Sequence, residues 1–93
     1  MSSLGPESRL IRSQQMISTN LDEETVLMSI EAGAYYGLEG PARSIWEALE
    51  KPITYSELLL QLTEEYQTTT ETCAPDVEKF LQEMVREGLL RVE

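Results

Sequence analysis

The sequence predicts a single α+β domain in which a three-stranded antiparallel sheet is followed by three helices. Two β-type runs, separated by a short segment that ends in glycine, stand in the first half of the chain. Amphipathic helical patterns with start and stop signals fill the second half. A length of 93 residues permits one hydrophobic core, and 41% apolar residues are enough to build it.

The N-terminal part of the chain carries the weakest signals. Residues 1–9 are small and polar and have no periodicity, so we expect a flexible tail over residues 1–13 and a domain over residues 14–93. A weak strand is expected over 14–19, where Met16 and Ile17 lie among serine and threonine, and a polar turn follows it.

A β-hairpin is the clearest element of the first half. Residues 26–30 and 34–38 are β-type runs, and the three residues between them end in Gly33, which adopts a left-handed conformation without strain. This connection places six side chains on the core face in three facing pairs: Ile30 with Ala34, Met28 with Tyr36, and Val26 with Leu38.

Two helices are expected in the middle of the chain. Pro41 suits a first helical turn, and an apolar stripe continues to about Lys51. Thr54 and Glu57 form a capping-box pattern that opens the second helix. The apolar face of that helix consists of Tyr55, Leu58, Leu59, Leu62 and Tyr66.

The last helix is expected over 75–87, after a polar loop over 67–72, with Gly88 as its stop. On a helical wheel its apolar side chains cover about 140°, which is wider than the ~100° needed to pack on one core. Acidic side chains lie beyond Phe80, and Lys79 and Arg86 lie on the back. Residues 89–92 predict a short closing strand.

This wide stripe permits two interpretations. It is either a broad core stripe with a solvated polar edge, or one wall of a groove that accepts apolar anchors with basic neighbours. In a meander the strand at 34–38 is a sheet edge, and its sequence has no proline or lysine to protect it. An exposed edge beside an apolar helix binds extended peptides, although Tyr35 and Tyr36 also fit a purely structural aromatic pair.

Composition excludes several classes of function. Seventeen acidic and seven basic residues give a net charge of −10, which repels a nucleic-acid backbone. The chain has no histidine, so most metal sites and histidine-assisted nucleophiles are excluded. Three features favour a protein that is cytoplasmic and does not span a membrane. The chain has a single cysteine, Cys73, no secretion signal and no long apolar stretch.

DNA binding and catalysis are the two alternatives to peptide binding. Strands followed by three helices also occur in winged helix-turn-helix DNA-binding domains, but the middle helix (54–66) has glutamates and no lysine or arginine. An enzyme needs an activated nucleophile, a paired carboxylate cleft or a metal cluster, and none is evident. We therefore expect a binding protein without catalytic residues, cofactors or metals.

Several short segments, in this order, resemble the PqqD-like proteins. They are Gly33-Ala34-Tyr35-Tyr36-Gly37-Leu38, Ala42, Ile45-Trp46-Glu47-Ala48-Leu49, Asp76-Val77, Phe80-Leu81 and Gly88-Leu89-Leu90. The resemblance spans residues 14–92. It departs from the family pattern at Glu39, where the family often has asparagine, so the corner between strand and helix is expected to be capped differently.

The resemblance implies a winged-helix-like fold and a function. PqqD-like proteins bind leader segments of ribosomally made, post-translationally modified precursor peptides and present them to modifying enzymes. A free-standing chain of this size is most similar to the recognition protein of lasso-peptide pathways, which works with a leader peptidase and a cyclase. By resemblance, the leader adds as a strand to 34–38 and lies against the last helix.

We therefore expect a peptide site formed by this strand and this helix. Apolar anchors dominate its affinity, and the acids tune selectivity for basic leader residues. The predicted site residues are Ala34, Tyr35, Tyr36, Gly37, Leu38, Asp76, Val77, Phe80, Glu83, Met84 and Glu87.

Overall fold

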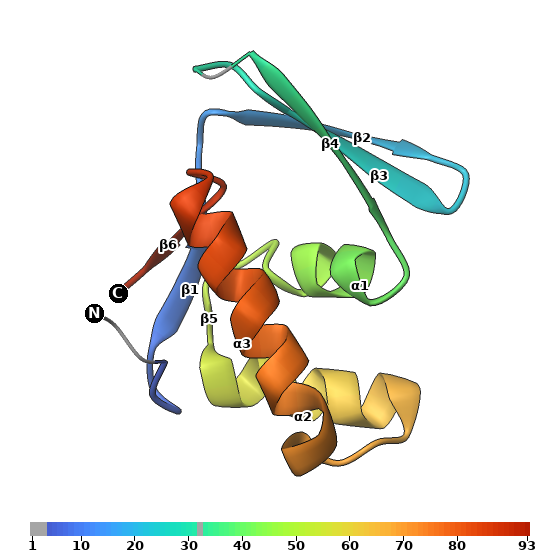
Figure 1. Ribbon diagram of the computed structural model, residues 1–93, viewed down its shortest axis with the longest axis vertical. Helices are drawn as coiled ribbons and strands as arrows, with labels where there is room; N and C mark the ends of the chain where they lie inside the picture. Colours follow the sequence, from blue (N-terminus) through green and yellow to red (C-terminus); the bar gives the residue numbers. More distant parts are fainter. Residues whose placement is uncertain (1–3, 32) are drawn as a thin grey trace.

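The computed structural model describes residues 4–31 and 33–93 and has two small sheets and three helices (Figure 1). The larger sheet is antiparallel and has the order β2-β3-β4; the smaller has the order β5-β1-β6. This confirms the predicted α+β class, with a three-stranded antiparallel sheet and three helices. The elements in chain order are β1 Arg9–Arg12, β2 Met16–Leu21, β3 Glu24–Ser29, β4 Ala34–Glu39, α1 Pro41–Ala48, β5 Ile53–Thr54, α2 Tyr55–Tyr66, α3 Thr70–Arg86 and β6 Leu90–Val92.

The predicted pairing of the hairpin is wrong by one residue. Ser29 pairs with Ala34, Leu27 with Tyr36 and Thr25 with Leu38, so the connection has four residues and not three. Gly33 keeps the expected left-handed conformation (φ 66°), and its N–H donates to the Ser29 carbonyl.

The extra loop residue reverses the faces of β3, because side chains alternate along a strand. Leu27 is fully buried, and Thr25 and Ser29 are buried beside it. The predicted core residues Val26 and Met28 are only half-buried, and Ile30 is 61% exposed. The assignment holds for β4, where Tyr36 and Leu38 face inward and Tyr35 is exposed.

The predicted flexible tail over 1–13 is wrong for Arg9–Arg12. These residues form β1, the central strand of the smaller sheet, which pairs with β5 on one side and β6 on the other. Leu10 is fully buried in the core, and one buried leucine in a four-residue strand is too little for a periodicity to be visible. The part of this prediction that concerns residues 1–3 lies outside the described residues. The expected closing strand is present as β6.

The helices α1 and α2 follow the sequence signals closely. Pro41 opens α1, and Ile45, Trp46 and Leu49 are buried as its apolar stripe predicted. The capping box at the start of α2 is confirmed: the Glu57 N–H donates to the Thr54 hydroxyl, and the Thr54 N–H donates to the Glu57 carboxylate.

The helix α3 is longer than predicted at its N-terminus. It begins at Thr70, within the expected loop, because Thr69 caps it by accepting from the Thr72 N–H. Pro75 therefore lies inside the helix and not at its start. The end is as expected: Gly88 has φ 80°, its N–H donates to the Val85 carbonyl, and the next N–H donates to the Met84 carbonyl.

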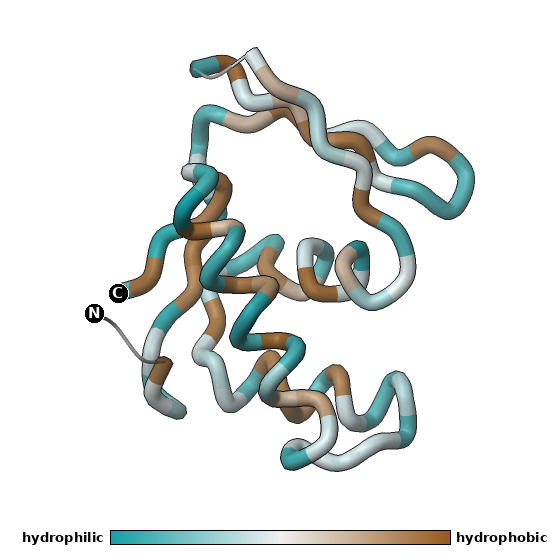
Figure 2. The backbone as a smooth tube through the Cα atoms, in the orientation of Figure 1, coloured by the Kyte–Doolittle hydropathy of each residue, from teal (hydrophilic) through white to brown (hydrophobic). Residues whose placement is uncertain are grey.

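The core lies between the helices and the inner faces of both sheets. Figure 2 shows apolar and polar stretches alternating along α3, as expected for a helix that is buried on one side. Within the described residues, no helix is long and apolar enough to span a membrane.

The capping box gives a test of local stability. Thr54→Ala removes the acceptor for the Glu57 N–H and should lower the free energy of unfolding by about 1 kcal/mol, the usual value of an N-cap. Urea denaturation followed by circular dichroism measures the change. The control is Thr68→Ala, in the loop after α2, which should change stability by less than about 0.5 kcal/mol. Equal losses in both variants would contradict the role of the cap.

Candidate functional site

The strand β4 is an edge of the larger sheet. Among the described residues it pairs with β3 only, and its other side has no neighbouring strand. Edge strands are usually protected by lysine, proline or a covering element, and β4 (Ala34–Glu39) has neither of these residues. The edge predicted from the sequence is therefore present and open.

The direction of the hydrogen-bonding groups on β4 follows from the ladder. The Ile30 N–H donates to the Gln15 carbonyl, so Ile30 directs its backbone toward the β2 side. Backbone groups alternate along an antiparallel strand, so Thr25, Leu27 and Ser29 bond to β4. Their partners are Leu38, Tyr36 and Ala34. The remaining β4 residues therefore point their N–H and C=O groups outward, and these are Tyr35, Gly37 and Glu39.

A cleft of about 230 Å³ separates β4 from α3. Tyr36 and Leu38 line it from the strand, and Phe80 and Met84 from the helix. Its remaining lining residues are Glu83, Arg86, Glu87 and Leu89. The cleft thus has an apolar floor and charged ends beside an open strand edge.

One hydrogen bond crosses the cleft. The Tyr36 hydroxyl donates to Oε1 of Glu87 over 3.0 Å, which ties the strand to the C-terminal end of the helix. This bond raises the pKa of Tyr36, because deprotonation would lose the bond; desolvation and then the negative charge of Glu87 raise the pKa further. The bond is therefore present below about pH 10, the ordinary pKa of tyrosine, and is lost as the pH rises through the raised pKa.

The structure brings six of the predicted site residues together around this cleft: Tyr36, Leu38, Phe80, Glu83, Met84 and Glu87. Ala34, Tyr35 and Gly37 lie on the same strand but not in the cleft lining. Val77 is buried in the core, and Asp76 is exposed and does not line the cleft.

Two cleft residues were not predicted. Arg86 was placed on the back of the helix, but it lines the cleft, so the helix flank is not purely acidic. Arg86 lies in the last turn of α3, directly before the cleft residue Glu87. Leu89 follows the helix stop at Gly88, so a helical wheel of the last helix does not contain it.

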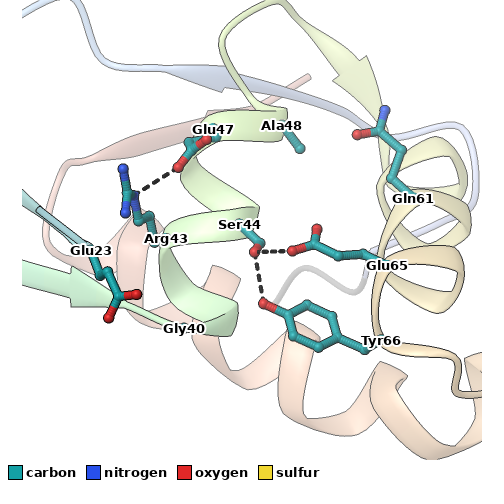
Figure 3. Close-up of a pocket in the computed structure, with 9 residues that line it drawn as sticks. All are labelled: Glu23, Gly40, Arg43, Ser44, Glu47, Ala48, Gln61, Glu65 and Tyr66. Carbon is teal, nitrogen blue, oxygen red and sulfur yellow. Dashed lines mark hydrogen bonds and ion pairs between the residues drawn. The ribbon is translucent and has the colours of Figure 1, made fainter. Parts of the chain in front are cut away.

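Another hollow of about 680 Å³ lies between α1 and α2, with Glu23 and Gly40 also in its lining (Figure 3). Its polar side chains bond to one another: Arg43 pairs with Glu47 at 2.8 Å, and the Ser44 hydroxyl donates to Glu65 at 2.7 Å. Since the single Ser44 proton is used there, the Tyr66 hydroxyl donates to Ser44. The two Ser44 bonds join α1 to α2, the Arg43–Glu47 pair lies within α1, and together they use much of the polar lining.

Nothing in residues 4–31 and 33–93 gathers three histidine, cysteine, aspartate or glutamate side chains in a way that could hold a metal ion. The β4–α3 cleft offers backbone hydrogen bonding along the strand edge, apolar side chains in its lining and charged side chains beside them.

Comparison with protein families gives the identity of this arrangement. The family model described as Coenzyme PQQ synthesis protein D (PqqD) matches residues 24–90, which include β3, β4 and all three helices. The chain belongs to the PqqD family. The resemblance noted in the sequence is therefore confirmed.

A solved structure is similar to this PqqD-family chain over nearly its whole length. It is described as TbiB1 in complex with the TbiA(beta) leader peptide, with a TM-score of 0.81 and 28% sequence identity. The similarity covers 87% of this chain and 94% of that chain. No curated protein with which the sequence was compared is significantly similar to it.

The Tyr36–Glu87 bond can be tested by titration. Glu87→Ala removes the acceptor and the negative charge, so the pKa of Tyr36 should fall toward the ordinary value of about 10. NMR of 13C-labelled tyrosine measures the titration. Glu83→Ala is the matched control, since it removes a carboxylate from the same helix without touching this bond. An equal fall in both variants would show that general charge, and not the hydrogen bond, is responsible.

Proposed function

We propose that this protein binds the leader segment of a ribosomally made precursor peptide by adding it as a strand to β4 against α3. The observation that carries the proposal is the open edge of β4 beside an apolar cleft. The family and the similarity to TbiB1, solved with a leader peptide, support it.

Affinity and selectivity come from different parts of this site. The outward backbone groups of Tyr35, Gly37 and Glu39 bond to any extended peptide and do not read its sequence. One or two apolar or aromatic leader side chains enter the cleft near Phe80 and Met84 and supply most of the binding free energy. Exposed charge pairs contribute only ~0–1 kcal/mol each, so the acids adjust selectivity toward basic leader residues.

The protein acts without catalysis of its own and delivers the leader to processing enzymes in the cytoplasm. We propose a leader peptidase and a cyclase of lasso-peptide biosynthesis, or of a related pathway, as these enzymes. A leader bound as a strand suits this task. The precursor residues that follow the bound segment extend beyond the sheet edge, so an enzyme can reach and modify them.

Removing the central apolar anchor site tests the cleft. Phe80 is half-buried and lines the cleft from α3, so Phe80→Ala should weaken binding by about tenfold or more. Fluorescence anisotropy measures the affinity for a labelled leader peptide, whose sequence is taken from the precursor gene nearest to the gene of this protein. Leu60→Ala, on the exposed side of α2, is the control and should bind as the parent does. Unchanged affinity in Phe80→Ala, with its fold intact by circular dichroism, would remove the cleft from the site.

Proline substitution in β4 tests strand addition separately from the cleft. The Gly37 N–H points to the open edge, so Gly37→Pro removes no bond within the sheet but takes away one bond to the peptide. We expect about tenfold weaker leader binding, the upper range for one lost hydrogen bond. Gly37→Ala adds the same Cβ and keeps the N–H, so it should retain affinity. Equal affinities for the proline and alanine variants would exclude pairing along β4.

A further inference from the structure

A second groove lies on the opposite flank of α3. It has a volume of about 670 Å³, and its apolar lining consists of Leu81 and Val85 from the helix and Leu90 and Val92 from β6, with Leu4 also in contact with it. Val85 is 41% exposed, so the core does not use this end of the wide apolar stripe. The groove accounts for the part of the stripe that the β4 cleft leaves unused.

The strand beside this groove is also an edge. The strand β6 pairs only with β1 in the described structure. The Glu93 N–H donates to the Arg9 carbonyl, and the Ser13 N–H donates to the Leu89 carbonyl, so residues 89, 91 and 93 face β1. By alternation, Leu90 and Val92 direct their backbone groups to the open side. The groove therefore repeats the arrangement of the cleft, with an edge strand beside an apolar helix flank.

The charged side chains of the two sites differ. Arg86 lines both of them, but the β4 cleft adds Glu83 and Glu87, whereas the second groove adds Arg91 and has no carboxylate in its lining. Arg91 pairs with Glu93 at 3.0 Å, and both side chains are more than half exposed. Among the described residues Arg86 forms no ion pair. Two arginines on one groove are notable in a chain with seven basic residues and a net charge of −10.

We propose that the β6–α3 groove binds an extended segment of a partner protein that carries aliphatic side chains flanked by carboxylates. The aliphatic side chains pack on Val85 and the groove floor, the backbone pairs with Leu90 and Val92, and the carboxylates pair with Arg86 and Arg91. Charge complementarity selects this occupant, because a basic segment, such as the β4 cleft favours, places like charges together here. The other α3 residues of the two sites lie on opposite flanks of the helix, and Arg86 lies at the border between the sites.

Two synthetic peptides test the proposal: acetyl-Asp-Leu-Val-Leu-Glu-amide and its lysine counterpart, acetyl-Lys-Leu-Val-Leu-Lys-amide. With the 15N-labelled full chain, NMR titration of the acidic peptide should give saturable shifts at Val85, Leu90 and Val92. It should bind about tenfold more tightly than the lysine peptide, the effect of two exposed charge pairs. Shifts centred on β4, or equal binding of the two peptides, would overturn the proposal.

Variants separate the groove from the leader site. Val85→Glu should abolish acidic-peptide binding and leave leader binding unchanged, whereas Leu60→Glu, the same type of change on α2, should affect neither. Arg91 lines only the second groove, so Arg91→Glu should remove the preference for the acidic peptide. Lys79→Glu changes the net charge equally at an exposed site and should keep that preference. Concentration-dependent shifts at Val85 without peptide would instead assign the groove to a second copy of this chain.

Discussion

The backbone edge of β4 is the feature on which the rest of the structure depends. The outer edge of β4 stays open because no strand of the described chain lies beside it, and α3 makes its main packing contacts with α2 and β6. The space left between strand and helix is the apolar cleft, crossed by the Tyr36–Glu87 bond. The same packing that completes the core thus leaves the recognition surface uncovered.

Much of this could be predicted from the sequence, because the relevant signals are local. The capping box at Thr54, the proline at the start of α1 and the glycine stop at Gly88 depend on residues within one helical turn. The sequence also predicts both walls of the cleft, which are the strand 34–38 and the apolar and acidic flank of the last helix.

The errors concern what local signals do not fix. Hairpin register depends on loop length. Both the predicted and the observed loop end at Gly33, and they differ only in whether Ile30 belongs to the strand or to the loop. The strand β1 has a single fully buried side chain, Leu10, so its sequence shows no alternating pattern. It is a strand because β5 and β6, which are distant in the sequence, pair with it. Arg86 lines the cleft although the helical wheel places it on the back of α3, because a wheel gives the direction of a side chain and not the reach of a long one.

The unprotected strand edges give the strong negative charge of the chain a further physical meaning. Both β2 and β4 end the larger sheet without lysine or proline, and Ile17 and Tyr35 are exposed on its outer face. Such margins promote self-association into extended sheets and aggregates. With a charge of −10, two copies repel each other as they approach within the ~8 Å over which physiological salt screens charge. Charge repulsion between copies therefore opposes the self-association that lysine or proline residues prevent at other sheet edges, and it does so without blocking the backbone groups of the edge.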